Sequence, residues 1–328
     1  MVSNCFNRVV LSSPGRLAMP IATYPGLALT GAGVRDIVTR AAAQYDSQAA
    51  LLGRYGNRFA LTAMDLSAEA EAFGCQLFLS ENEVPSVVGR LVTSLDQAKA
   101  LRVPKPGEGR TSVYLESVKL LKGLPGAPLV LGGCIGPFSL AARLVGVSEA
   151  LELTLAEPEL MRVALEKSAA FLSEYTAAFK KAGADGLLMA EPAAGLLSPK
   201  GMSSFSSDWI RQIAAPLRDG HFAFILHNCA ARLLHLPSIL QTGLTTFHFG
   251  APMDIAAALG KVPAEVVLCG NLDPTAVFCQ SKPEEVAART AELLKATAEY
   301  RNFVVSSGCD LPPRTPLEAL DAFYAVRR

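Results

Sequence analysis

The residues best suited to chemistry in this chain are one histidine and two cysteines that lie far apart in the sequence. His227 and Cys229 come directly after the apolar run Phe222–Leu226, and Cys309 follows eighty positions later, just beyond the run Phe303–Ser307. Two thiolates and one imidazole at strand ends form a ligand set that binds zinc and leaves one coordination position for chemistry. Residues two apart in a strand point the same way, so His227 and Cys229 are expected to face one site. From the spacing alone, a second interpretation stays open, in which both cysteines are small buried apolar residues and His227 is a hydrogen-bonded core histidine.

The composition of the 328-residue chain favours a protein with a large apolar core. Half of the residues are apolar and 18% are charged, and no apolar run is long enough to predict a transmembrane helix. Thirty basic residues balance thirty acidic ones, which argues against nucleic-acid binding driven by net charge. The seven cysteines are an odd number in a long chain, which is typical of reduced cytoplasmic proteins rather than of a disulfide framework. The amino terminus lacks the pattern of a signal peptide, so we expect a cytoplasmic location.

Short apolar runs alternate with longer amphipathic segments along most of the chain. The pattern predicts strands at residues 129–131, 186–189, 222–226, 245–248, 266–268 and 303–307, and helices at 158–182, 209–217 and 283–300. Buried strands that alternate with helices indicate a parallel sheet covered by helices, and about eight strand candidates favour a closed (β/α)8 TIM barrel. We therefore expect an α/β protein in which residues 1–328 form one barrel domain. Residues 1–110 would hold a less regular N-terminal extension and the first barrel elements.

Polar residues gather where the predicted strands end. In a (β/α)8 barrel the active site lies at the carboxyl ends of the strands. The residues at those points are Cys134, Glu191, His227, Cys229, His248, Asn271, Asp273 and Cys309. The candidate zinc ligands thus lie where a barrel would place its chemistry.

Two carboxylates are candidate catalytic residues. Glu191 ends a predicted strand, so it could orient a zinc ligand, bind substrate or move a proton. The alternative for Glu191 is a solvated loop carboxylate or the partner of a helix cap. Asp65 opens a helix-like segment, where it could contact substrate or favour the N-terminus of that helix.

Three further residues are candidates for contact with a cofactor. Gly133, next to Gly132, lets the backbone approach closely at a strand end, where a phosphate or a corrinoid tail could lie; a tight turn is the alternative. Asn271 and Asp273 could contact a cofactor or partner, or shape the turn Gly270–Pro274. Cys134 is expected to be buried packing, with metal binding as the alternative.

In these residues the chain resembles a known family, the uroporphyrinogen decarboxylase superfamily, and within it the corrinoid-dependent methyltransferase branch. Members of that branch move a methyl group from a methylated corrinoid protein to coenzyme M. The motifs that carry the resemblance extend over most of the chain, and they are Asp65–Gly74, Gly132–Leu140, Glu191–Ala194 with Leu197–Pro199, His227–Cys229, Gly270–Pro274, and Gly308–Cys309 with Thr315–Pro316.

The resemblance implies a fold, a metal and partners. The fold is a (β/α)8 barrel, and the ion is Zn2+ held by His227, Cys229 and Cys309. A methylcorrinoid would arrive on a partner protein, and a small thiol or methylated compound would be the other substrate. From the charge balance and the lack of a long apolar run we expect no nucleic acid and no membrane among the partners, and a homodimer is compatible with the sequence.

Two departures from the family pattern bear on function. Decarboxylases carry an arginine-rich N-terminal motif and a late histidine, whereas this chain has a single arginine, Arg16, and Cys309 at those places. Thiol-methylating relatives have an acidic residue soon after the strand at 245–248, but here none occurs before Asp254. His248 or Glu191 would then be the substitute fourth ligand, or the site would be more open.

The sequence therefore supports a leading hypothesis and two alternatives. The leading one is a zinc-dependent methyltransferase that works with a corrinoid protein. The alternatives are a metal-independent decarboxylase of the uroporphyrinogen type and a non-catalytic barrel in which zinc is structural or absent.

Overall fold

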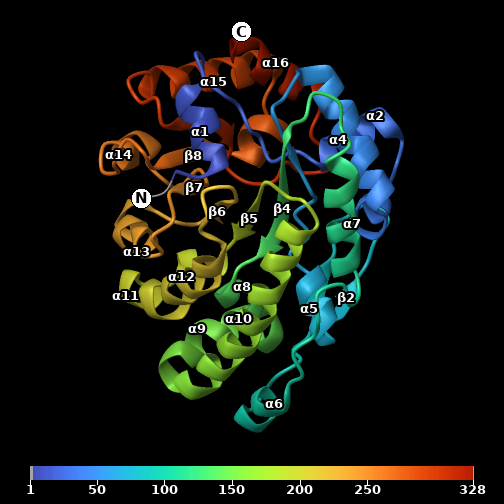
Figure 1. The fold of residues 1–328 in the computed structure, drawn as a ribbon, viewed down its shortest axis with the longest axis vertical. Helices are drawn as coiled ribbons and strands as arrows, with labels where there is room; N and C mark the ends of the chain where they lie inside the picture. Colours follow the sequence, from blue (N-terminus) through green and yellow to red (C-terminus); the bar gives the residue numbers. More distant parts are fainter. Residues whose placement is uncertain (1–2, 328) are drawn as a thin grey trace.

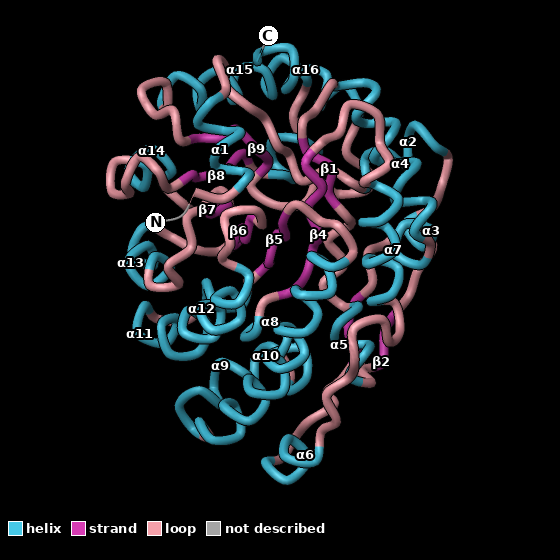
Figure 2. The backbone as a smooth tube through the Cα atoms, in the orientation of Figure 1, coloured by secondary structure: helices cyan, strands magenta, loops and turns pink. Residues whose placement is uncertain are grey.

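The central feature of the fold is one curled sheet of seven parallel strands. In the computed structural model, which describes residues 3–327, each strand pairs with the next one along the sheet in the order β1-β4-β5-β6-β7-β8-β9 (Figures 1 and 2). The strands are β1 (Phe59–Leu61), β4 (Leu129–Ile135), β5 (Gly186–Ala190), β6 (Ala223–Asn228), β7 (Thr246–Phe249), β8 (Val267–Leu272) and β9 (Phe303–Ser307). A separate antiparallel hairpin joins β2 (Gln76–Phe78) to β3 (Ser86–Val88).

Helices surround this sheet (Figure 1). The α-helices are α1 (Cys5–Ser12), α2 (Leu27–Thr30), α3 (Val34–Thr39), α4 (Ala41–Tyr55), α5 (Ala68–Phe73), α6 (Leu95–Ala100), α7 (Thr111–Leu121), α8 (Pro137–Val145), α9 (Val147–Ala156), α10 (Pro158–Lys181), α11 (Pro199–Met202), α12 (Asp208–Ala214), α13 (Leu236–Leu240), α14 (Ile255–Leu259), α15 (Pro283–Ala296) and α16 (Leu317–Arg327). Within residues 3–327, none of them has both the length and the apolar character needed to cross a bilayer.

In every strand of the curled sheet except β7, alternate residues enter two different apolar clusters. Leu131, Leu188 and Ile225 belong to the cluster inside the curled sheet, whereas their neighbours pack outward with the helices. Both faces of the strands are thus covered, which explains the continuous apolar runs in the sequence. Phe6 and Val10 of α1 join the inner cluster, so α1 closes one end of it. The side chain of Asn7 in α1 bonds the carbonyl of Thr245 just before β7, which places this plug at the amino ends of the strands.

An eighth extended segment, residues 17–22, lies beside β9 without forming a full strand. Met19 N donates to Val305 O at 3.0 Å, and Val305 N donates to Leu17 O at 3.1 Å. The backbone N–H and C=O groups of the odd-numbered residues in this segment point toward β9, so those of the even-numbered residues point toward β1. Pro20 therefore removes a backbone donor on the β1 side. This explains why the structure has seven ladder strands where the sequence suggested about eight.

Two glutamines of α4 satisfy the edge of β1 that the segment leaves open. Gln48 Nε2 donates to Ala22 O at 3.1 Å while its Oε1 accepts from Leu61 N at 3.2 Å. Gln44 Oε1 accepts from Ala63 N at 3.0 Å. Because the two glutamines are four residues apart on one helix, they face the same edge.

The expected elements from residue 129 onward are present, with shifts at their ends. The helix expected at 158–182 is α10, and the strand expected at 303–307 is β9. The helix expected at 283–300 ends at Ala296, since Thr297–Tyr300 turns toward β9. The strand expected at 129–131 continues to Ile135, because Gly132 and Gly133 remain in the ladder with β5.

Candidate metal centre

His227, Cys229 and Cys309 converge at the carboxyl ends of the strands. His227 is the second-last residue of β6, Cys229 directly follows that strand, and Cys309 lies two residues beyond β9. Their ligand atoms all lie within 4.8 Å of one another, although β7 and β8 separate β6 from β9 in the sheet. The convergence expected from the sequence is therefore present in the fold.

Two glycines allow the loops that carry the cysteines to approach so closely. A Cβ atom added to Gly250, after β7, would lie 2.1 Å from the carbonyl oxygen of Cys229. A Cβ atom on Gly308 would lie 2.9 Å from the backbone nitrogen of Ala251. Both positions thus require glycine for close backbone contact rather than for an unusual φ. Together they pack the ends of β6, β7 and β9 against each other beneath the cluster.

A chain of hydrogen bonds fixes the orientation of His227. His227 Nδ1 lies 2.8 Å from His248 Nδ1, and His248 Nε2 lies 2.8 Å from Ser306 Oγ. Ser306 uses its single hydroxyl proton to donate to Met19 O at 2.5 Å, so its oxygen must accept from His248 Nε2–H. Burial also holds the pKa of His248 well below its usual range, which keeps this ring neutral. Its Nδ1 then accepts from His227 Nδ1–H, and His227 Nε2 carries a free lone pair.

That lone pair has no protein partner in the structure. His227 is buried, and its Nε2 is among the buried polar atoms of the described chain that make no hydrogen bond. An unpaired buried nitrogen costs free energy that a metal ligand bond would offset. The donor set of one imidazole and two sulfurs therefore fits a zinc ion. The other ring nitrogen of His227, Nδ1, is hydrogen-bonded to His248, as the second nitrogen of a zinc-binding histidine commonly is to a neighbouring group.

The two thiols change each other's pKa. The Cys309 thiol donates to Cys229, which lowers the pKa of Cys229. The same contact, together with burial, raises the pKa of Cys309 to about 12, while His227 opposes this rise. The protein alone thus favours at most one thiolate here, and a divalent cation would supply the charge that two thiolates need.

Both residues considered as substitute fourth ligands are occupied elsewhere. His248 uses both ring nitrogens in the chain described above. Glu191 Oε1 accepts from Phe138 N at 2.8 Å and from Ser206 Oγ at 3.0 Å, and Oε2 accepts from Ser139 N at 3.0 Å. Burial raises the pKa of Glu191 to about 7. Glu191 therefore holds the first turn of α8 against the end of β5, and a catalytic role for it stays a prediction.

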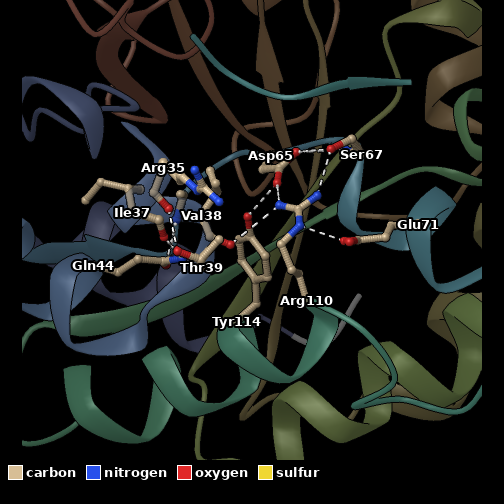
Figure 3. Close-up of polar contacts among 11 residues, drawn as sticks. Arg35, Ile37, Val38, Thr39, Gln44, Asp65, Ser67, Glu71, Arg110 and Tyr114 are labelled. Atoms are coloured by element: carbon tan, nitrogen blue, oxygen red, sulfur yellow. Dashed lines mark hydrogen bonds and ion pairs between the residues drawn. The ribbon is translucent and has the colours of Figure 1, made fainter. Parts of the chain in front are cut away.

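Asp65 lies in a separate buried cluster (Figure 3). Its carboxylate pairs with Arg110 and accepts from Tyr114 Oη at 3.0 Å and from Ser67 Oγ at 2.5 Å. Arg110 Nε also donates to Glu71 at 2.6 Å. The cluster ties the segment after β1 to α7 through Arg110 and Tyr114. A substrate role for Asp65 stays a prediction.

The three candidate cofactor contacts occupy tight backbone positions. Gly133 lies in β4, where an added Cβ would be 2.7 Å from Met64 Sδ. Asn271 Nδ2 donates to Met253 O at 2.7 Å and to Gly250 O at 3.1 Å, and so braces the loop that packs on Cys229. Asp273 accepts from the backbone N–H groups of the two residues after Pro274 and begins the short helical turn there. Contact of these residues with a cofactor is still a prediction.

Two residues beside the candidate ligands, Ser306 and Asp310, were not identified from the sequence. Ser306 lies within the strand predicted at residues 303–307, where the sequence gives no sign that its hydroxyl has a specific partner. Asp310 directly follows Cys309, and this adjacency is the only feature of the sequence that links it to the candidate ligands. Cys134, weighed as an alternative ligand, is buried in β4 and is not part of the three-residue group.

Comparison with known proteins adds three findings. Residues 18–328 match the family described as Uroporphyrinogen decarboxylase (URO-D). The methylcobamide:CoM methyltransferase MtbA of Methanosarcina acetivorans is 28% identical over 256 residues, which cover 77% of this chain and 74% of that protein. A uroporphyrinogen decarboxylase of Psychromonas ingrahamii is 26% identical over 289 residues, covering 84% and 80% of the two chains.

A solved structure extends the similarity to the whole fold. The structure described as a methyltransferase from Methanosarcina mazei matches with a TM-score of 0.86, covering 97% of this chain and 96% of the other. The two sequences are 22% identical, so this likeness speaks for the fold alone. The similar proteins thus include methyltransferases and decarboxylases by name, and the choice between these activities depends on the site.

Proposed function

Because this chain belongs to the uroporphyrinogen decarboxylase family, we propose that it is the kind of member that transfers methyl groups: a zinc-dependent methyltransferase that works with a corrinoid protein. The methyl group would pass between the corrinoid of that partner and a small thiol or methylated compound. The convergence of the ligand atoms of His227, Cys229 and Cys309 within 4.8 Å of one another carries this proposal.

The roles of the chain's own residues follow from that geometry. His227, Cys229 and Cys309 would hold the ion, with His248 and Ser306 fixing the lone pair of His227 toward it. Zinc bound by three protein ligands supplies a Lewis acid that makes a thiol acidic at neutral pH. Glu191 and His248 are both hydrogen-bonded to other protein groups, so we propose a substrate as the fourth ligand of the ion. Coenzyme M is one acceptor that the similar methyltransferases suggest.

The position of Arg16 argues against decarboxylation of a porphyrinogen. Its guanidinium donates to the carbonyls of Thr297, at 2.8 Å, and of Phe303, at 3.0 Å, as well as to Tyr300 O. Phe303 begins β9, so Arg16 lies at the amino ends of the strands, opposite the metal cluster. It is therefore unavailable to bind substrate carboxylates at the carboxyl ends.

We further propose that residues 1–328 are one domain and that the segment 17–22 acts as the eighth strand of a closed (β/α)8 barrel. The hydrogen bonds from this segment to β9 and the bridge that Gln48 makes to β1 support the closure. The plug of α1 at the opposite end supports a single functional opening at the carboxyl ends.

The test of the proposed function compares the wild type with Cys309→Ser. The wild-type protein should purify with close to one zinc per chain and should demethylate free methylcobalamin in the presence of a thiol, followed by the visible spectrum of the corrinoid. Cys309→Ser should lose most of its zinc and this activity while keeping its circular dichroism spectrum. Cys279→Ser is the matched control, because Cys279 lies outside the metal cluster. A wild-type protein that folds without zinc and without chelators present would contradict the proposal.

A further inference from the structure

Cys229 and Cys309 are two free thiols that the fold brings together from distant parts of the chain. They are eighty positions apart in the sequence, yet their sulfurs belong to the group of ligand atoms that lie within 4.8 Å of one another. All seven cysteines of the chain are free. The sulfurs of a disulfide bond lie about 2.0 Å apart, so these two sulfurs need to approach by less than about 3 Å to form one.

Glycine contacts hold the loops that carry the two cysteines against each other. An added Cβ on Gly250 would lie 2.1 Å from Cys229 O, and one on Gly308 would lie 3.1 Å from Gly250 Cα. Gly250 thus contacts both the backbone of Cys229 and the residue before Cys309. Both cysteines lie in bends just outside their strands. The remaining approach of the sulfurs therefore needs rotation of side chains rather than movement of a strand.

Both cysteines of the pair remain accessible from the open end of the sheet. Cys229 and Cys309 are half-buried, whereas Cys75, Cys134 and Cys269 are buried. Helix α1 fills the amino ends of the strands, and the pair lies at the carboxyl ends. A small reagent therefore reaches the pair from the same side as the proposed substrate.

The other two half-buried cysteines have oxygen atoms as their partners. Cys5 Sγ donates to Asp185 O at 3.1 Å, and Cys279 Sγ lies 3.1 Å from Thr315 Oγ1. An oxidised cysteine closes a disulfide only when a second thiol lies within reach. Cys229 and Cys309 supply such a thiol to each other.

From this geometry we infer that Cys229 and Cys309 form a modification site for a peroxide, which converts the two thiols into an intramolecular disulfide bond. One thiol attacks a peroxide oxygen, so that the O–O bond breaks, one water leaves and a sulfenic acid forms. The sulfur of the second thiol then attacks the sulfenic sulfur, and its proton leaves with the hydroxyl group as a second water. The two thiols lose two electrons, and one hydrogen peroxide is reduced to two waters.

In the proposed zinc form, the same modification removes two of the three protein ligands. Zinc binds cysteine as the thiolate, and a sulfur in a disulfide is no longer one. His227 alone does not hold the ion, so closure of the disulfide releases the zinc, and reduction by a dithiol restores the site. The release of zinc rests on the proposed function, whereas formation of the disulfide rests on the proximity of the two sulfurs.

The experiment treats the reduced protein, with and without zinc, with hydrogen peroxide. A chromogenic thiol reagent counts the free thiols of the denatured protein, a chromophoric chelator measures released zinc, and mass spectrometry of an unreduced digest locates the disulfide. We expect the loss of two of the seven thiols and a cross-linked peptide pair that contains Cys229 and Cys309. The zinc-loaded protein should release one zinc for every two thiols lost. Dithiothreitol should restore the thiols and zinc binding.

Cys229→Ser and Cys309→Ser each leave one sulfur of the pair without a second thiol. Peroxide should then produce a sulfenic acid at the remaining cysteine, which dimedone labels, and no cross-link. Cys279→Ser is the matched control, because Cys279 is half-buried like the pair and lies outside the group of converging ligand atoms. This variant should form the same disulfide as the wild type.

Two results would overturn the inference and leave the proposed function intact. One is a metal-free wild-type protein that keeps all its thiols in peroxide, and the other is one that oxidises without a cross-link between Cys229 and Cys309. A reduced protein that forms this disulfide but binds no zinc would support the inference and contradict the proposed function.

Discussion

At the scale of single residues, the site depends on side chains that prepare His227 as well as on the candidate ligands. Ser306 must accept from His248, and this requirement passes along the chain until His227 Nε2 is left with a lone pair. The sequence identified the candidate ligands, because their types and their places after strands are informative. It could not identify Ser306 or the direction of the hydrogen bonds, because those depend on which strands lie side by side.

The hydrogen-bond chain predicts that His248 controls metal affinity without touching the metal. His248→Ala should weaken zinc binding about 10- to 100-fold, which is typical for loss of a partner that orients a ligand. Ser306→Ala should have a smaller effect, since His248 stays hydrogen-bonded to His227 and loses only the acceptor that fixes its tautomer. Competition with a chromophoric zinc chelator measures both affinities.

Exposed His221→Ala serves as the control for these variants. Unchanged zinc affinity in His248→Ala would mean that His227 does not need this partner.

At the scale of elements, carboxylates hold helices to the central sheet. Glu191 receives the first turn of α8, and Glu69 of α5 accepts from Ile135 N at the end of β4, at 3.0 Å. The sequence placed Glu191 correctly at a strand end and named a helix cap as one alternative. Its partners could not be predicted, because they come from α8 and from Ser206, which are distant from Glu191 in the sequence.

Glu69 predicts a specific dependence of stability on pH. Burial raises its pKa from 4.5 to about 7, so the folded protein binds this proton more tightly than the unfolded chain does. The stability that this group contributes is therefore fully present below pH 4.5 and is lost as the pH rises to about 7. Glu69→Gln should remove this loss, and it should be more stable than wild type at pH 8 by about 3 kcal/mol at most.

Urea denaturation at pH 5 and pH 8 measures the effect, with exposed Glu83→Gln as the control. An equal drop in stability from pH 5 to pH 8 in wild type and Glu69→Gln would exclude a raised pKa for Glu69.

At the scale of the whole molecule, the two ends of the curled sheet differ. Helix α1 fills the end where the strands begin, whereas the candidate metal ligands and the unpaired polar atoms of His227 and Asp310 lie where the strands end. Strand and helix alternation was sufficient to predict the parallel sheet and this placement of the site. The junction between the segment 17–22 and β1 was not predictable, because side chains of α4 replace the regular ladder there.

The junction predicts an unusually large effect for one buried glutamine. Gln48→Ala should destabilise the protein by about 2–4 kcal/mol, because Leu61 N–H and Ala22 O both lose their partner. Urea denaturation gives the change, and hydrogen exchange of the Leu61 amide should speed up in the variant.

Exposed Gln76→Ala is the control for Gln48. A change no larger than that of the control would show that the junction does not depend on the Gln48 bridge.

The central claim is that His227, Cys229 and Cys309 hold a zinc ion whose remaining position is open to a substrate thiol. X-ray absorption at the zinc edge tests it directly, because sulfur and lighter ligands scatter differently. We predict two sulfur and two lighter ligands in the protein alone, and three sulfur ligands after a thiol substrate is added. A shell of four protein ligands that does not change with the thiol, or a folded protein that retains no zinc, would contradict the account.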